Sequence, residues 1–254
     1  MNYFILNCDI NCYSYLIESL YNTCLFWILS LTFLYFDITQ PKWIVKYKIQ
    51  NKHKLTKNRI FQMIKQNIFN QMIITPIFSF FWYNLLEIRQ LSTIEPLIYE
   101  YLTHFFIYFL ISEIIFYHVH RILHMPLLYK NIHSVHHDES NPIALSGYNN
   151  HWIEHILNGL IAMYTGHLVM GSNIKIFNLW IKLVTFVSVI FHCGYHFPFM
   201  FPNEFHDYHH LKHTQCYGVF GLFDYIYGTD KEYKKSKQYK RDKIYFYNEQ
   251  YPQK

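Results

Sequence analysis

Long apolar segments separated by short polar stretches form the main pattern along this chain of 254 residues. A helix that crosses a bilayer needs about 20 predominantly apolar residues. Five segments reach or approach that length: residues 13–36, 68–86, 96–117, 153–170 and 174–191. The sequence Gly-Ser-Asn at residues 171–173 predicts a turn, so that the last two segments form a helical hairpin. The pattern predicts an all-α integral membrane protein, a helical bundle with about four to five spanning or re-entrant helices.

Composition agrees with this class of protein. Hydrophobic residues make up 52% of the chain and charged residues only 15%, whereas soluble domains contain roughly 25% charged residues. Glu100 and Glu113 lie inside the third apolar segment, where a carboxylate is expected to face the protein interior. The five cysteines lack CxxC spacing and indicate neither a disulfide framework nor a zinc knuckle, which favours a reducing, intracellular setting.

Basic residues are concentrated in the loop between the first two apolar segments. Residues 42–65 contain eight Lys or Arg and no Asp or Glu, so the positive-inside rule places this loop in the cytoplasm. Because successive spans alternate in direction, the third and fifth segments are then expected to end on the cytoplasmic side. The Lys-rich tail from Lys231 to Lys254 is assigned to the same side.

Histidines cluster in the second half of the chain, where 15 of the 17 lie between His118 and His213. Ten of them form two HxxxH pairs and two HxxHH triplets, in an order that repeats once. Imidazole is the commonest metal ligand, and this density exceeds the needs of acid–base catalysis. The candidate metal ligands are His120, His124, His133, His136, His137, His192, His196, His206, His209 and His210. Two half-sites of similar design predict a cytoplasmic two-metal centre.

The spacing also predicts how ligands are shared. Residues four apart on a helix lie on one face, so His120 and His124 are expected to close on one metal. The same holds for His192 and His196. In each triplet the first two histidines share a face, while the adjacent third points elsewhere. A triplet then serves either two metals, or one metal and a hydrogen-bonding neighbour of a ligand.

The ligand set narrows the chemistry. Ten histidines exceed one tetrahedral shell, and all-nitrogen ligation suits iron, copper, zinc or nickel. A nitrogen-rich two-metal site beside lipid, without a hydrolytic nucleophile motif, favours dioxygen chemistry. A metal transporter is a weaker alternative because transport requires polar residues along the spans, whereas these groups lie at span ends and in loops.

From Glu113 to Asp230 the sequence resembles the fatty acid hydroxylase superfamily, which includes the C4-methyl sterol oxidases. The motifs of that superfamily occur here in their usual order as HRILH, LYKNIHSVHH, NHWIEH, HCGYH, FHDYHHLK and CYGVFGLFDYIYGTD. The resemblance implies a membrane-bound enzyme that uses two iron ions and O2 to hydroxylate a lipid C–H bond, usually at the endoplasmic reticulum. It implies electrons from NAD(P)H through cytochrome b5 or a similar carrier. Zinc is an expected substitute for iron on heterologous expression.

The resemblance assigns the ten histidines as ligands and adds three neighbours. His151 and Glu154 occupy the HPxE segment of the superfamily, in which Trp152 replaces the usual Pro. Each is expected to be a ligand or the hydrogen-bonding partner of a ligand. Asp207 adjoins the second triplet, where a carboxylate is expected to accept the other N–H of a ligand.

Three regions follow from these interpretations. Residues 1–95 are predicted to form an N-terminal membrane anchor region with the cytoplasmic Lys-rich loop. Residues 96–230 are predicted to form a fatty acid hydroxylase-type di-iron domain, and residues 231–254 a basic cytoplasmic tail. The expected partners are the membrane, a lipid substrate and an electron-donor protein, with no nucleic acid.

The favoured function is a sterol C4-methyl oxidase-like activity in lipid biosynthesis. The pair HRILH has three intervening residues, as in the sterol oxidase branch, whereas fatty acid 2-hydroxylases tend to have four. A fatty-acyl or sphingolipid hydroxylase is the alternative within the same enzyme class. A non-catalytic membrane scaffold or metal-binding protein is the alternative of another class, and the ten filled ligand positions count against it.

We predict that the 42–65 loop and the tail after Lys231 both face the cytoplasm. In a cysteine-free background, Lys46→Cys and Lys240→Cys should react with an impermeant maleimide applied to the cytoplasmic face of sealed vesicles. Both should react because basic loops are retained on that side. Labelling of either position only from the lumenal face would separate the histidine groups and contradict a shared site.

Overall fold

The structure is a computed structural model that describes residues 10–50, 55–89, 91–92, 94–244 and 246. Within these ranges the chain is helical and forms no strand, only an isolated bridge between Lys48 and Tyr195. The α-helices are α1 (Ile10–Thr39), α2 (Lys42–Val45), α3 (Lys57–Phe69), α4 (Thr75–Arg89), α5 (Ile98–Leu123), α6 (Pro126–Asn131), α7 (Trp152–Glu154), α8 (Ile161–Met170), α9 (Ile174–His192), α10 (Glu204–Lys212) and α11 (Leu222–Tyr227). Short 3-10 and π-helical elements join them: η1 (Asn70–Ile74), η2 (His133–Asp138), η3 (Ala144–Tyr148), η4 (His155–Leu160), η5 (Tyr233–Lys235) and η6 (Tyr239–Arg241).

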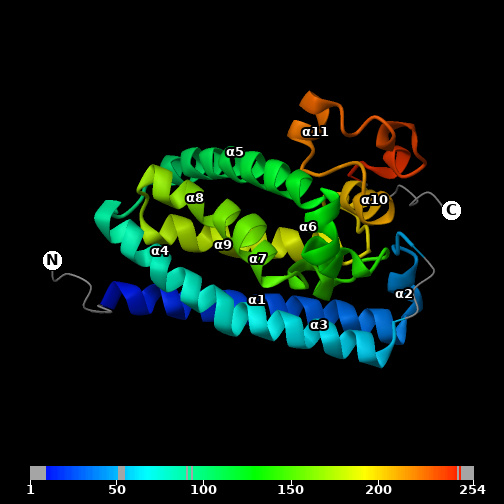
Figure 1. Cartoon of the computed structure of the whole chain (residues 1–254), viewed down its shortest axis with the longest axis horizontal. Coiled ribbons are helices and arrows are strands. Elements are labelled where there is room, and N and C mark those ends of the chain that lie inside the picture. Colours follow the sequence, from blue (N-terminus) through cyan, green and yellow to red (C-terminus); the bar gives the residue numbers. More distant parts are fainter. Residues whose placement is uncertain (1–9, 51–54, 90, 93, 245, 247–254) are drawn as a thin grey trace.

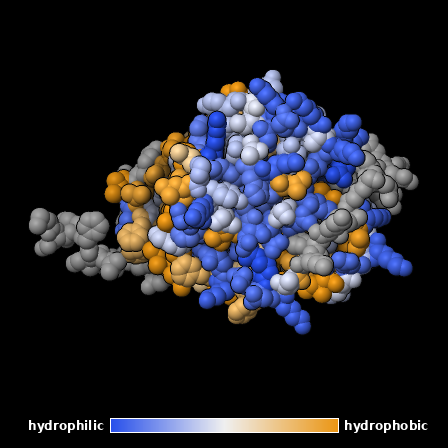
Figure 2. Space-filling model, turned by 45° about the vertical axis from the view of Figure 1, so that its right-hand side comes forward, coloured by the Kyte–Doolittle hydropathy of each residue, from blue (hydrophilic) through white to orange (hydrophobic). Residues whose placement is uncertain are grey.

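The long helices lie roughly alongside one another, and their directions decide where the histidines meet. Helices α1, α5 and α9 all run toward the end of the bundle that carries α6 and α10 (Figure 1). The stretch α3–α4 and the stretch α7–α8 run back in the opposite direction. The end that carries α10 is mainly hydrophilic, whereas hydrophobic side chains gather toward the opposite ends of the helices (Figure 2).

In the part of the chain that the structure describes, three helices are long and apolar enough to cross a membrane by length and composition: Tyr15–Thr39, Ile98–Leu123 and Ile174–His192. Each exposes large apolar side chains, including Ile28, Leu102 and Leu183, as a lipid-facing surface does. The predicted integral membrane helical bundle is thus confirmed. Its number of spans and the side that the histidines face stay predictions. In the two basic segments, residues 51–54 and 247–254 lie outside the described residues, so their placement also stays a prediction.

The other two predicted apolar segments are each interrupted by a π-helical turn. In the first, Pro76 has no N–H that could continue the helical hydrogen bonds, and the hydrogen bond of the preceding residue, Thr75, goes to the carbonyl of Asn70. Thr75 donates both its backbone N–H and its hydroxyl, the latter at 3.1 Å, to that oxygen. The second interruption is η4, which makes helix α8 only 10 residues long.

The N-terminal helices share a core with the second half of the chain. Phe26 of α1 stacks on Tyr148 with ring centroids 4.6 Å apart, and Met63 of α3 belongs to the same buried cluster. Side-chain amides add polar contacts: Asn67 donates to the carbonyl of Leu145 at 2.9 Å and Asn70 to that of Asn150 at 2.9 Å. Helices α1 and α3 therefore hold the 144–150 segment, which follows the first histidine triplet.

The two carboxylates of the third apolar segment behave differently. Glu113 is buried and accepts hydrogen bonds from the backbone N–H groups of Val219, Phe220 and Leu222, as expected for a carboxylate at this depth. Glu100 does not face the interior. It lies in the first turn of α5 and accepts the N–H of Leu97 at 2.7 Å, because the free N–H groups at a helix start attract a carboxylate.

Helices α5 and α8 pack closely at Gly166, where a Cβ atom would lie 2.5 Å from the ring of Tyr108. We predict that Gly166→Ala lowers the free energy of unfolding by about 1–3 kcal/mol, because overpacking a buried contact costs that much. Gly159→Ala is the control, since the nearest atom to its Cβ would be 3.8 Å away. Thermal unfolding in detergent measures both, and equal midpoints for the two variants would contradict the prediction.

Candidate metal centre

Nine of the ten candidate ligands come together at one end of the bundle, in two adjoining groups. Within each group the ligand nitrogens all lie within 4.8 Å of one another. The first group is His120, His124, His133, His137 and His209. The second group is His136, His192, His206 and His210. The groups touch, since the ring centroids of His137 and His210 are 4.7 Å apart.

Four elements deliver these side chains. His120 and His192 lie in the last turns of α5 and α9, where the carbonyl end of a helix favours a cation. Each HxxHH triplet is divided between the groups, which is the first of the two alternatives left open by the spacing. The expected partners are wrong, because the first and third histidines of each triplet share a group and the middle one enters the other. On α10 adjacent residues point about 100° apart, so that His209 enters the first group and His210 the second.

Hydrogen bonds fix the protons of several imidazoles on Nδ1. His120 Nδ1 donates to the carbonyl of Tyr217 at 2.6 Å, His209 Nδ1 to that of Gln215 at 2.7 Å, and His192 Nδ1 to that of Ser188 at 2.7 Å. A carbonyl oxygen only accepts, and a neutral imidazole carries one N–H. The Nε2 atoms of these three residues are therefore bare lone pairs that point into the groups.

In the first group two such lone pairs face each other. His133 belongs to this group and lies beside a carboxylate, with its Nδ1 2.9 Å from Glu154 Oε1. His120 and His209 both carry their proton on Nδ1, so neither Nε2 has a hydrogen to donate, and the ligand nitrogens of this group lie within 4.8 Å of one another. Facing acceptors at this distance repel unless a cation lies between them.

Burial keeps the imidazoles in the form that binds metals. Desolvation lowers the pKa of five histidines outside the predicted spans well below the usual 6.5, and neighbouring imidazoles lower it further: His136, His137, His206, His209 and His210. All five side chains are buried. At neutral pH they are uncharged, and each offers a lone pair.

The spacing of the nitrogens fits a first-row transition metal. With bonds of about 2.1 Å, ligands at 90° to tetrahedral angles are about 3.0–3.4 Å apart, and opposite ligands about 4.2 Å. His124 and His209 place their Nε2 atoms 3.2 Å apart, and His206 and His210 do so at 3.2 Å. Both groups can therefore hold a metal ion by imidazole nitrogens, as in sites for iron, copper, zinc or nickel.

A backbone loop behind His120 is held by two buried carboxylates. Glu113 accepts the N–H groups of Val219, Phe220 and Leu222 at 3.2–3.3 Å. Asp224 accepts the N–H groups of Tyr217 and Gly218 at 2.8 and 2.7 Å. These contacts fix the Tyr217 carbonyl that orients His120.

Gly218 shows how tightly this loop is packed. A Cβ atom there would lie 2.7 Å from Glu113 Oε1 and 2.9 Å from Asp224 Oδ2. Because Glu113 lies inside an apolar span, the sequence indicates that it has a partner in the protein interior. Nothing in the sequence indicates that Asp224 holds the same loop.

Four predicted site residues lie outside the two groups or beside them. His196 does not join His192, because α9 ends at His192 and the helical i, i+4 geometry does not continue beyond it. The Nδ1 atom of His196 lies 2.8 Å from Glu204 Oε1 instead. His151 caps α7 by accepting the N–H of Ile153 at 3.2 Å. Glu154 lies against His133, as described above. Asp207 accepts from Gln50 at 2.7 Å and Gln238 at 2.8 Å rather than from a histidine.

An apolar cavity opens onto both histidine groups. It lies between α5, the η4–α8 stretch and α9, and reaches His120 of the first group and His136, His192 and His206 of the second. Its walls are largely hydrophobic and include Phe116, Ala162, Met163, Val184, Val187 and Phe191. The site can therefore bring an apolar substrate to the nitrogens of both groups.

Comparison with known proteins identifies related sequences. Residues 105–229 match the family model described as Fatty acid hydroxylase. The chain is 39% identical over 220 residues to Fatty acid hydroxylase domain-containing protein 2 of Homo sapiens, across 84% of this chain and 66% of that protein. It is 32% identical over 219 residues to Fatty acid hydroxylase ahd1 of Mycosarcoma maydis, across 85% of this chain and 57% of that protein.

A plant relative is covered more fully. Methylsterol monooxygenase 1-3 of Arabidopsis thaliana is 31% identical over 216 residues, across 80% of this chain and 74% of that protein. The chain thus spans less than two thirds of the length of the human and fungal relatives, and more of the plant one. No solved structure matches the chain.

We predict that the purified protein binds about two transition-metal ions, one for each group. His133→Ala in the first group and His206→Ala in the second should each lower the content to about one ion, because each removes a buried ligand. His118→Gln is the control, since His118 bonds the Ile114 carbonyl and belongs to neither group. Metal analysis by mass spectrometry on detergent-solubilised protein gives the stoichiometry. A folded wild-type protein that carries no metal after reconstitution would contradict the prediction.

Proposed function

Because the chain belongs to the fatty acid hydroxylase family, we propose that it is a membrane-bound di-iron oxygenase that hydroxylates a lipid C–H bond with O2. Family membership confirms the resemblance found in the sequence and supports a lipid-oxidising oxidoreductase of membranes. The observation that carries the finer proposal is the apolar cavity that reaches histidines of both groups. A substrate held there would have its C–H bonds beside both metal positions.

Two iron ions, when bound, would supply the binding and reductive activation of dioxygen that oxidation of an unactivated C–H bond requires. The protein contributes the ligands, and we propose the nine grouped histidines for this role. Carbonyls of residues 188, 215 and 217 keep the protons of His192, His209 and His120 on Nδ1. The hydrophobic walls exclude water and hold the lipid in place.

As substrate we propose a sterol, oxidised at a methyl group on C4. The similarity to a protein named methylsterol monooxygenase supports this choice, because it extends over 80% of this chain, as does the HxxxH spacing of the first pair. A fatty-acyl lipid is the second candidate, which the 32% identity to a protein named fatty acid hydroxylase favours.

The remaining assignments concern the setting of the enzyme. We place it in the endoplasmic reticulum membrane with the histidines on the cytoplasmic side, and with electrons from NAD(P)H through cytochrome b5 or a similar carrier. The bridge between Lys48 and Tyr195 supports a common side, because it joins the Lys-rich loop to the segment that follows α9. For organisation along the chain, we keep 96–230 as the di-iron domain between the anchor region 1–95 and the tail 231–254.

We predict that His136→Ala and His209→Ala, one in each group, each lower O2-dependent turnover at least about hundredfold, since each removes a metal ligand. Insertion should persist, because the spans depend on apolar length rather than on metal. Oxidation of a 4-methylsterol by microsomes supplied with NADH and NADPH measures turnover, with His118→Gln as the matched control. If both alanine variants kept full activity, the di-iron assignment would fail and a scaffold function would take its place.

A further inference from the structure

Apart from His136 and from Glu154, which lies against His133, two residues that line the apolar cavity carry a polar atom without a partner. His155 and Asn158 both line it, and their side chains are only 2% and 5% exposed. Neither His155 Nδ1 nor Asn158 Oδ1 has a hydrogen-bond partner among the described residues. An unsatisfied buried polar atom costs roughly 1–3 kcal/mol, so that two of them in one hydrophobic cavity indicate a ligand that satisfies them.

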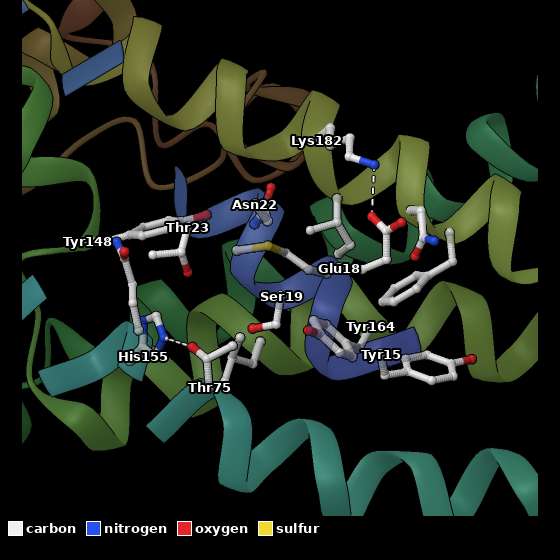
Figure 3. A pocket seen from close by; sticks show the side chains of 16 residues that line it. Tyr15, Glu18, Ser19, Asn22, Thr23, Thr75, Tyr148, His155, Tyr164 and Lys182 are labelled. Carbon is white, nitrogen blue, oxygen red and sulfur yellow. Dashed lines mark hydrogen bonds and ion pairs between the residues drawn. The ribbon is translucent and has the colours of Figure 1, made fainter. Parts of the chain in front are cut away.

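The other nitrogen of His155 fixes what Nδ1 can do. The Thr75 hydroxyl donates its single hydrogen to the carbonyl of Asn70 at 3.1 Å. Toward His155 it can then only accept, and His155 Nε2 lies 2.9 Å away (Figure 3). His155 therefore carries its proton on Nε2. A buried imidazole without a counter-charge is neutral, which leaves Nδ1 as an acceptor, like Asn158 Oδ1.

The charges around the cavity restrict the ligand further. None of the described residues that line it is Lys or Arg, and the carboxyl group of Glu154 lies in its wall. The nearby cation Lys182 lines a separate polar pocket, where it pairs with Glu18 at 2.8 Å (Figure 3). A carboxylate or phosphate held at His155 Nδ1 and Asn158 Oδ1 would thus meet two acceptors and no cationic side chain, which is unfavourable. A hydroxyl group can instead donate its hydrogen.

We propose that His155 Nδ1 and Asn158 Oδ1 form a subsite that accepts a hydrogen bond from a hydroxyl group of the lipid substrate. The enzyme then selects a lipid alcohol over a free fatty acid. This inference rests on the proposed function, in which the cavity receives the substrate. The polar network around Thr75 holds the imidazole in the required tautomer, so that His155 and Asn158 determine specificity rather than take part in the oxidation.

Binding to purified, metal-reconstituted protein in nanodiscs tests the subsite without turnover. The probes are two matched radiolabelled pairs: a 4-methylsterol and its 3-ketone, and hexadecanol and hexadecanoic acid. A ketone and a carboxylate accept hydrogen bonds but do not donate, so wild-type protein should bind each alcohol at least about tenfold more tightly than its partner. Equal binding within both pairs, or tighter binding of the acid, would overturn the proposal.

Variants then assign the preference to the two residues. His155→Leu and Asn158→Leu should reduce it to within about twofold, because each removes an acceptor. Met163→Leu is the control, as an apolar residue of the same cavity that keeps its volume, and it should retain the wild-type preference. Metal content, measured in parallel, checks that each variant is folded. A preference that survives in both leucine variants would show that an ordered water, not the substrate, satisfies these atoms.

The result separates this inference from the proposed function. If the alcohols bind preferentially but are never oxidised, the subsite stands and the oxygenase assignment fails. If wild-type protein oxidises alcohol and acid lipids equally well, the oxygenase assignment stands and the subsite fails.

Discussion

Neutral imidazoles that point their lone pairs at one another need a cation between them, and this constraint governs the end of the bundle that carries α6 and α10. His120 and His209 carry their protons on Nδ1 and direct bare Nε2 atoms into the same group, and burial lowers the pKa of His209 well below its usual value, so that protonation does not relieve the repulsion. The remaining structure holds this arrangement in place. Helices α5 and α9 end beside the groups, α10 divides one triplet between them, and Glu113 and Asp224 fix the loop that orients His120.

The same helices that position the histidines also line the apolar cavity. Helices α5 and α9 each contribute a histidine at their ends and hydrophobic side chains one to two turns earlier, so the cavity walls lead to the metal positions. Only a few polar atoms interrupt these walls, and those of His155 and Asn158 have no protein partner in the described structure. A family of lipid-oxidising enzymes can keep one metal scaffold and vary substrate by changing such positions.

The sequence predicts features that depend on local spacing and misses those that depend on how helices meet. Apolar length identifies α1, α5 and α9, and the i, i+4 rule correctly groups His120 with His124. The rule does not hold for His196, because α9 ends at His192. Division of the triplets depends on the relative placement of η2 and α10, and the pairing of Glu154 with His133 joins residues 21 positions apart. Neither can be read from periodicity. The π turn at residues 70–74 follows from Pro76, which predicts a break but not its geometry.

The source of the oxygen atom in the product tests the central claim most directly. Purified protein with two bound iron ions, an electron donor and a 4-methylsterol would be incubated under 18O2 in ordinary water, and the product examined by mass spectrometry. The account predicts that the hydroxyl group introduced in the first turnover carries 18O from dioxygen. A product whose new oxygen comes from water, or that forms at the same rate without O2, would contradict it.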